Sequence, residues 1–218
     1  MSLWVLFWAV AAFVGGHFVV SGTPVRARIV KLIGERAFKA LFGVYALATL
    51  AWVVLAYANA PYMPLWPEAA ALGWITLVLS AAGLLLLVPG AMTRKPDGAG
   101  SGIHAVTRHP MNWGIALWAV GHLVVNGDAA SALLFGGILL LALGGSVSQD
   151  RKAKVRLGAD WEAYAKATSS LPLAAILSGR AKMRLADIGW PRLVIAVVVI
   201  VVLIGVHEIL FGVAPLPV

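Results

Sequence analysis

Residues 103–128, which read IHAVTRHPMNWGIALWAVGHLVVNGD, form the stretch that decides the fold. The Thr-Arg-His-Pro sequence ending at Pro110 is typical of a helix start, because proline is tolerated where the first backbone N–H has no partner within the helix. His122 follows His109 by 13 residues, inside an apolar run. At a rise of about 1.5 Å per residue, one helix would hold the two imidazoles roughly 20 Å apart along its axis. We therefore expect His109 near one end of a helix and His122 deep within it.

The composition places this helix in a membrane. The 218 residues are 61% hydrophobic and only 12% charged, and the mean hydropathy is +0.91. Soluble domains carry about 25% charged residues, so these values predict an integral membrane protein. Six apolar segments approach the length that a bilayer core of about 30 Å requires. They are Leu3–Val20, Leu41–Asn59, Ala69–Val88, Met111–Val125, Ala130–Val147 and Leu193–Val213. The prediction is an all-α membrane helix bundle that forms a single domain over residues 1–218.

The positive charges predict the orientation of the bundle. All 17 Lys and Arg residues lie in three segments, at residues 26–39, 94–108 and 151–192. With six spans these segments share one side, and the positive-inside rule makes that side the cytoplasm of a bacterial-type inner membrane. Both termini are then outside, and residues from about 148 to 190 form an amphipathic cytoplasmic segment. Topology and attraction to the anionic lipid bilayer account for the net charge of +8, so no nucleic-acid partner is predicted.

The absence of cysteine restricts the chemistry of any metal site. Without cysteine the chain has no thiolate ligand and no cysteine nucleophile. A metal would have to be held by the five histidines, the carboxylates or the methionines.

His17 lies within the last two turns of the first apolar segment, directly after Gly15 and Gly16. An ionisable residue at that depth in a membrane is a candidate for function. The alternative is a histidine at the interface that is bound to a backbone carbonyl. Phe13 lies one turn earlier on the same helix face.

The helix after Pro110 carries a stripe at successive i+4 positions, formed by Met111, Ile115, Trp118 and His122. Such a stripe usually packs in the core. A histidine flanked by glycine, as His122 is by Gly121, is nevertheless well suited to approach a flat ligand.

Two other histidines have simpler interpretations. His104 lies in a glycine-rich loop, where it is expected to face solvent. His207, next to Glu208, lies near the outer end of the last apolar segment and is interpreted as a boundary residue.

Several motifs resemble the NnrU family, membrane proteins associated with nitrite and nitric oxide respiration, and the related zeta-carotene isomerase family of plants. The matching segments are GGHFVVSG, KLIGERAFKALF, GIHAVTRHPMNWGIALWAVGHLVVNGD, SQDRKAKVRLGADWEAYAKATSSLPLAAI and the Gly179-Arg180 pair. They cover most of the chain up to about Arg180, in a specific order and spacing.

The resemblance implies a haem b group and cis-trans isomerisation of a carotenoid double bond. Carried over by motif, the iron ligands would be His17 and His122, and two imidazoles give a six-coordinate iron. His109 is the alternative to His122. Where the isomerases have histidines after the fifth helix, this chain reads LALGGSVSQDRK, which puts the isomerase reaction in doubt.

Further cofactor contacts and substrates are expectations of the same kind. Arginines are suited to bind haem propionates, and the candidates are Arg26, Arg36 and Arg108. Trp118, one turn before His122, is a further cofactor-binding candidate. The apolar substrate would be a carotenoid or a quinone, and nitric oxide is the third possible partner.

A second enzyme class remains open at this point. The Arg-His-Pro sequence and the segment ending WEAYAKATSSLP also resemble the isoprenylcysteine and phospholipid methyltransferases of membranes. That resemblance implies S-adenosylmethionine bound near His109 and Asn112. The family usually has a pair of glutamates after the following span, where this chain has Gln149 and Asp150.

Overall fold

The computed structural model describes residues 1–21, 23–67, 70–93 and 101–216, and within them the chain is helical, with no β-strand. The elements are α1 (Leu3–Gly16), the π-helical turn η1 (His17–Ser21), α2 (Val25–Ile33), α3 (Glu35–Ala58), α4 (Ala70–Met92), α5 (Ile103–Val106), α6 (Pro110–Asn126), α7 (Ala129–Leu157), the 3₁₀ turn η2 (Gly158–Asp160), α8 (Trp161–Ala167), α9 (Ala174–Leu177), α10 (Leu185–Ile188) and α11 (Trp190–Phe211). The predicted all-α class is confirmed.

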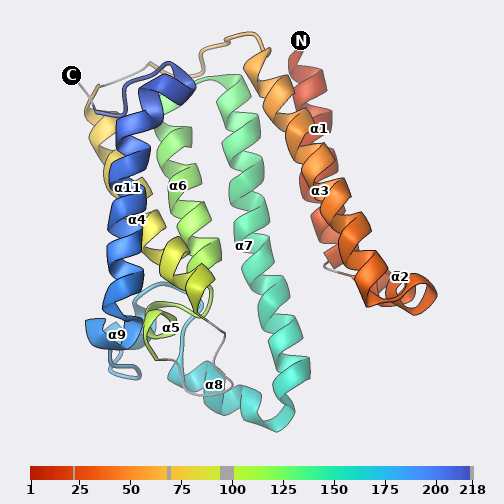
Figure 1. Ribbon diagram of the computed structural model, residues 1–218, viewed down its shortest axis with the longest axis vertical. Helices are drawn as coiled ribbons and strands as arrows, with labels where there is room; N and C mark the ends of the chain where they lie inside the picture. The colour runs from red at the N-terminus through yellow and green to blue at the C-terminus, as the bar shows by residue number, and fades with distance from the viewer. Residues whose placement is uncertain (22, 68–69, 94–100, 217–218) are drawn as a thin grey trace.

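Five segments of the described chain are long and apolar enough to cross a membrane. They are Leu3–Val20, Glu35–Ala58, Ala71–Met92, Ala129–Ala167 and Trp190–Phe211. The remaining predicted span corresponds to α6, which has 17 residues and lies alongside α4 and α7 (Figure 1). At about 1.5 Å per residue α6 is roughly 25 Å long, slightly short of the bilayer core. The membrane bundle is confirmed, and the count of six spans stays a prediction.

The helices form one row of neighbours, with α4, α6 and α7 at its centre. In Figure 1, α11 packs beside α4 at one edge, and the pair α1 and α3 lies beyond α7 at the other. Small residues bring α4 and α6 together. A Cβ atom added to Gly114 would lie 2.5 Å from the carbonyl oxygen of Gly83, and Thr76 donates a hydrogen bond to the carbonyl of Gly121 at 2.8 Å. Such close approach of backbones is typical of helix contacts in membranes.

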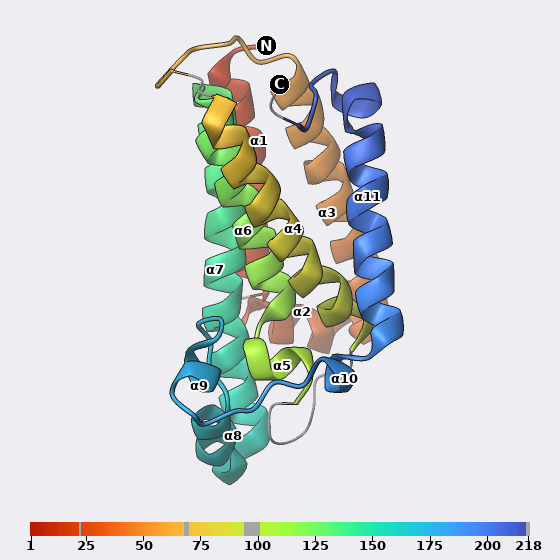
Figure 2. The same ribbon diagram turned by 90° about the vertical axis from the view of Figure 1, so that its left-hand side faces the viewer.

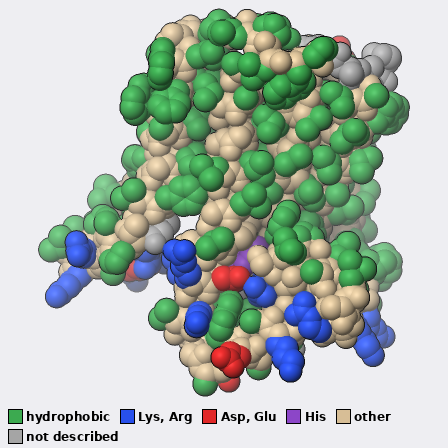
Figure 3. Space-filling model, turned by 180° about the vertical axis from the view of Figure 1, so that it is seen from behind, with side chains coloured by type: hydrophobic (Ala, Val, Ile, Leu, Met, Phe, Trp, Pro, Cys, Tyr) green, Lys and Arg blue, Asp and Glu red, His purple; other side chains and the backbone are tan. Residues whose placement is uncertain are grey.

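The two ends of the bundle differ in charge. The described Lys and Arg side chains gather at one end, which we call the basic end (Figure 3), and both termini lie at the opposite end (Figure 1). Of the predicted basic residues, Arg94 and Lys95 lie outside the described residues. The shared position of the charged segments agrees with the predicted topology. Which side of the membrane the basic end faces stays a prediction.

Short helices cover the basic end. The helices α5, α8, α9 and α10 lie there below the bundle, and α2 lies there beside α3 (Figures 1 and 2). The 29 residues of α7 span roughly 43 Å, so its charged last turns extend past a bilayer core of about 30 Å. The amphipathic segment predicted from about residue 148 to 190 is not one continuous helix. It is interrupted at Gly158, whose φ of +56° ends α7 because glycine adopts that conformation readily.

Candidate functional site

A group of polar side chains joins α6 to α7 at the basic end. We call it the polar cluster, and its members are Arg108, His109, Asn112, Gln149 and Asp150. Arg108 donates from Nη2 to Asp150 Oδ2 at 2.8 Å and from Nε to Asp150 Oδ1 at 3.2 Å. His109, only 4% exposed, places Nε2 2.7 Å from the same Oδ1 and Nδ1 3.3 Å from Gln149 Oε1. The carboxylate thus binds two neighbouring side chains of the Arg-His-Pro motif.

Hydrogen bonds link the polar cluster into a chain along α6 and α7. Ser146 donates to the carbonyl of Ala142, and Asn112 Nδ2 donates to Ser146 Oγ. Gln149 Nε2 donates to Asn112 Oδ1, and Gln149 Oε1 lies 3.3 Å from His109 Nδ1. Both ring nitrogens of His109 thus have partners within the protein.

Residues 168–173, which we call the strap, are joined by hydrogen bonds to the start of α6 next to the polar cluster. Thr107 Oγ1 and Trp113 Nε1 both donate to the carbonyl of Ser170 at 2.7 Å. The backbone N–H of Arg108 donates to Ser169, and that of Leu173 donates to Val106, both at 2.8 Å. The strap therefore ties the start of α6 to the segment that follows α8. His109 and Asn112 were predicted as S-adenosylmethionine contacts. In the structure their side chains bond to Asp150, Gln149 and Ser146 of the protein itself.

His17 begins the π-helical turn at the end of α1. Its Nδ1 lies 2.6 Å from the carbonyl oxygen of Phe13. The centre of its ring lies 4.6 Å from the ring centre of Phe13 and 5.1 Å from that of Phe42. Because a carbonyl only accepts, Nδ1 carries a proton, and the neutral ring keeps its lone pair on Nε2. Single π-helical turns occur frequently at functional sites.

A groove lies between α1, η1, α2 and α3; His17 is not part of its lining, but the ring of His17 contacts the lining residue Phe42. Its volume is about 510 Å³. The lining is Gly15, Gly16, Val19, Val20, Ile29, Ile33, Phe38, Leu41, Phe42 and Tyr45. One wall is a row of stacked rings on α3, with Phe38 and Phe42 5.8 Å apart at 5° and Phe42 and Tyr45 6.1 Å apart at 23°. We call this space the aromatic groove.

One arginine predicted as a propionate contact lies beside the aromatic groove. Arg26 donates to Glu35 at 2.6 Å and lies 5.3 Å from the centre of the ring of Phe38, which lines the groove. Arg36 is exposed and forms no ion pair with a described residue. The third candidate, Arg108, is bound to Asp150. Of the three, Arg36 thus has the guanidinium that is not committed to a carboxylate of the protein.

The structure does not bring His17 and His122 together. His122 donates from Nδ1 to the carbonyl of Trp118 at 2.9 Å, and its ring contacts Trp118 and Phe135 at 4.8 and 5.1 Å. His122 is four residues before the end of α6, whereas His17 follows the whole of α1. The end of α6 and the start of α1 lie opposite the basic end (Figure 1), so His17 lies nearer the basic end than His122 by roughly 15 Å.

Two histidines lie in places that the sequence did not indicate. His104 was expected in solvent but is only 2% exposed, because it forms part of α5 beneath the bundle. His207, interpreted as a boundary residue, has its ring centre 6.5 Å from that of His122. The signal was available, since His122 and His207 each lie four residues before the end of a helix, and both helices end on the same side.

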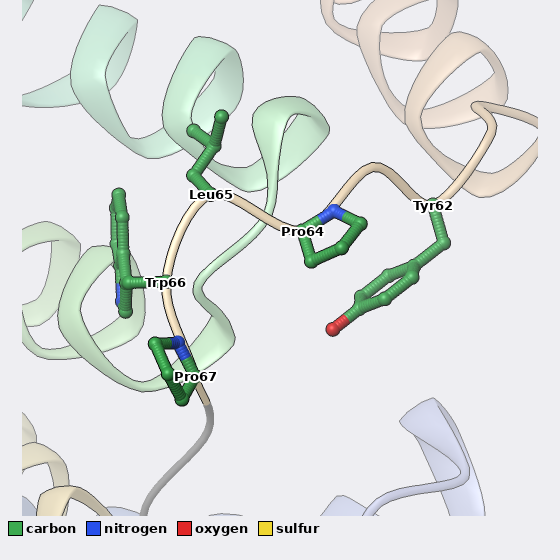
Figure 4. Close-up of a pocket in the computed structure, with 5 residues that line it drawn as sticks. All are labelled: Tyr62, Pro64, Leu65, Trp66 and Pro67. Atoms are coloured by element: carbon green, nitrogen blue, oxygen red, sulfur yellow. The ribbon is translucent and has the colours of Figure 1, made fainter.

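A second hollow, of about 520 Å³, lies in the loop between α3 and α4. Tyr62, Pro64, Leu65, Trp66 and Pro67 line it, and their side chains project from one extended segment without converging on a common point (Figure 4). Trp66 donates to the carbonyl of Val124 at 3.0 Å and so fixes the loop to α6. This hollow brings no reactive groups together.

Comparison with known proteins shows where the chain belongs. Two relatives are both described as 15-cis-zeta-carotene isomerase, chloroplastic. The relative from Arabidopsis thaliana is 32% identical over 163 residues, which cover 69% of this chain and 44% of the relative. The relative from Zea mays is 28% identical over 166 residues, or 70% of this chain and 45% of the relative.

The chain thus matches less than half the length of either curated relative, and no solved structure matches it. A family model described as NnrU protein matches residues 5–215. Because this match covers nearly the whole bundle, the chain belongs to the NnrU family.

Proposed function

We propose that this membrane protein is an isomerase for a cis double bond of a conjugated polyene, and that it works with a haem b held by His17. The likeness to 15-cis-zeta-carotene isomerases supports the reaction and the substrate class. The aromatic groove is the observation that carries the proposal. It is an apolar, ring-walled space whose wall residue Phe42 contacts the ring of His17, and the bond from Nδ1 to Phe13 leaves Nε2 as the nitrogen that could bind iron.

The residues of the groove fit a haem. Its volume of about 510 Å³ lies within the range of roughly 300–1,000 Å³ that is usual for cofactor sites. The hydrogen bond from Nδ1 to Phe13 orients the ring, as is common for metal-binding histidines. Arg26, which lies 5.3 Å from the ring centre of Phe38 in the groove wall, is suited to bind a propionate in place of Glu35. When bound through one histidine, haem would supply an iron with an open coordination position.

The remaining residues of the groove would orient the polyene. Flat conjugated molecules stack against aromatic rings, and Phe38, Phe42 and Tyr45 offer such a wall. Tyr45 donates its hydroxyl to the carbonyl of Ala12 at 2.5 Å, which holds the wall against α1. Leu41 and Val19 are exposed on the outer surface of the helices, so the groove opens toward the bilayer, from which an apolar substrate would enter.

The proposal favours a polyene over the other predicted partners. A quinone would also stack on the rings, and nitric oxide would occupy an open iron position. The relatives, however, are described as isomerases of a carotenoid. Nitric oxide then serves as a probe of that position. We also propose a bacterial-type inner membrane as the location, although the relatives are chloroplastic. Fractionation of the native cells tests that location.

The experiment is an absorption spectrum of the purified protein with haem, oxidised and reduced, for three chains. The wild type is expected to show a Soret band, and His17→Ala is expected to lose it while eluting unchanged in gel filtration. His122→Ala is the matched control and is expected to keep the band. Loss of the Soret band in His122→Ala, or full haem occupancy in His17→Ala, would contradict the assignment of His17 as the iron ligand.

Activity is tested separately from haem binding. The wild-type protein is incubated with 15-cis-zeta-carotene in detergent, and the isomers are separated by chromatography. Conversion that depends on haem and on His17 is expected. Haem binding without conversion would overturn the proposed reaction. Calorimetric binding of S-adenosylmethionine to the haem-free protein would instead favour the methyltransferase.

A further inference from the structure

We propose that His122 and His207 form a copper(I) site at the end of the bundle opposite the basic end. The two imidazoles come from α6 and α11, which are 64 residues or more apart in sequence, and their ring centres lie 6.5 Å apart at 36°. This inference does not depend on the proposed function, because the aromatic groove and His17 take no part in it.

Both histidines present the same nitrogen. His122 Nδ1 faces the carbonyl of Trp118 at 2.9 Å, and His207 Nδ1 faces the carbonyl of Val213 at 2.8 Å. A carbonyl accepts only, so each Nδ1 carries the proton and each neutral ring keeps a lone pair on Nε2. Within the described residues, neither Nε2 has a hydrogen-bond partner. A backbone carbonyl bound to one ring nitrogen is the usual way in which proteins fix the tautomer of a metal-binding histidine.

The distance between the ring centres of His122 and His207 can be compared with the distances expected for different coordination geometries. Histidine nitrogens bind metals at about 2.0–2.1 Å, and the ring centre lies about 1.1 Å beyond the nitrogen. Two such rings have centres about 6 Å apart when the nitrogen–metal–nitrogen angle is nearly linear, and about 5 Å apart when it is tetrahedral. With both Nε2 atoms turned to a shared ion, the observed distance of 6.5 Å between ring centres would suit the nearly linear case better than the tetrahedral one. Zinc is disfavoured, because it takes four ligands in a tetrahedron.

No third protein ligand is near. The described residues contain no group of three or more histidine, aspartate or glutamate side chains that could hold a metal ion. Glu208 is exposed, and as the next residue on the helix it points away from the face that carries His207. Two imidazoles alone are a sufficient ligand set for copper(I), which commonly binds two nitrogen donors in a line.

The surroundings favour a cation of low charge. The ring of Trp118 lies 4.8 Å and that of Phe135 lies 5.1 Å from His122, and Phe211 lies 4.9 Å from His207. Aromatic faces attract cations, but an apolar shell makes the dehydration of a divalent ion costly. A monovalent, weakly hydrated ion such as copper(I) therefore fits this shell better than a divalent ion.

The test is a titration of the full-length, detergent-solubilised protein with copper(I) under reducing conditions, in competition with a coloured copper(I) chelator. One copper(I) per chain is expected for the wild type, with affinity at least tenfold lower in His122→Ala and in His207→Ala. Glu208→Gln is the matched control and is expected to bind as the wild type does. Zinc, titrated alone, is expected to bind at least tenfold more weakly than copper(I).

Two outcomes would overturn the inference. The first is wild-type copper affinity in His207→Ala, and the second is an X-ray absorption spectrum with more than two nitrogen or oxygen neighbours around the copper. Gel filtration and thermal unfolding of each variant show whether it is folded, and the spectrum of the wild type decides the geometry even if a variant is not. Loss of haem in His207→Ala would assign the pair to the haem and overturn the copper site.

Discussion

The core formed by α4, α6 and α7 and the flank formed by α1, α2 and α3 use the same residue types in opposite ways. In the core, Gly114 meets the backbone of α4, the Arg108–Asp150 pair is mostly buried, and both nitrogens of His109 are bound. In the flank, Gly43 has no neighbour within 4 Å of an added Cβ, and the Arg26–Glu35 pair is exposed. The core thus bonds its polar groups to one another away from solvent, whereas the flank leaves its ion pair exposed and a groove of about 510 Å³ between its helices.

The largest effect on stability is expected from removing the carboxylate of the core. Asp150→Ala leaves the Arg108 guanidinium without its carboxylate and His109 Nε2 without its partner, at side chains that are 11% and 3% exposed. Breaking a buried pair commonly costs about 3–5 kcal/mol, and because Asp150 is 23% exposed we expect about 3 kcal/mol. The measurement is the free energy of unfolding in detergent, from denaturant titration.

Glu35→Ala is the matched variant in the flank. Its ion pair with Arg26 is 41–42% exposed at the side chains, so solvent screening limits the expected loss to about 0.5 kcal/mol. Equal losses for the two variants would show that the polar cluster is no more stabilising than a surface pair, and the contrast between core and flank would fail.

The second comparison is the same substitution at two helical glycines. Alanine favours a helix over glycine by about 1 kcal/mol, so Gly43→Ala in the flank is expected to raise stability by up to that amount. In Gly114→Ala the new Cβ would lie 2.5 Å from the carbonyl oxygen of Gly83 and 2.8 Å from Leu87 Cβ. The helices would have to separate, and we expect a net loss of about 1–3 kcal/mol. Thermal unfolding of both variants gives the two signs, and a stabilised Gly114→Ala would contradict the close packing of α4 and α6.

The bundle itself could be predicted from the sequence, because each span is recognised from its own apolar residues. An apolar run such as Leu3–Val20 needs no knowledge of its neighbours, and the three basic segments indicate their common end. The start of α6 at Pro110 was also predicted, since proline has a fixed place in a helix. Glycine and proline act through the backbone, and the backbone is what a sequence shows most directly.

The candidate site could be predicted only in part. His17 and His122 were recognised as unusual residues of membrane helices, but pairing depends on the heights at which two helices pass each other. Small errors in helix entry move a side chain by several ångströms, so His207 was missed as the neighbour of His122. The bond from His109 to Asp150 joins residues 41 apart, and its partner looked like an ordinary surface acid.

The smallest expected effect compares the caps of one core helix and one flank helix. Asp128 is buried, and its Oδ1 accepts from the backbone N–H groups of Ala130 and Ser131 at 2.9 and 3.1 Å at the start of α7. In the flank, the N-cap of α2 is Pro24, without a side-chain cap, and exposed Thr23 accepts from the N–H of Val25 at 3.2 Å. Loss of a cap costs about 0.5–2 kcal/mol, so we expect about 1.5 kcal/mol for Asp128→Ala and, because Thr23 is not the N-cap, no more than about 0.5 kcal/mol for Thr23→Ala.

Asp128→Asn separates capping from charge, because asparagine caps a helix as well as aspartate does. If the hydrogen bonds to Ala130 and Ser131 carry the effect, this variant keeps nearly the full stability of the wild type in denaturant titration. A loss in Asp128→Asn as large as that in Asp128→Ala would place the effect in the negative charge at the positive end of the α7 dipole. In that case the core helix would be held at this end by electrostatics, and the difference from the flank would lie in the charge of the cap and not in its burial.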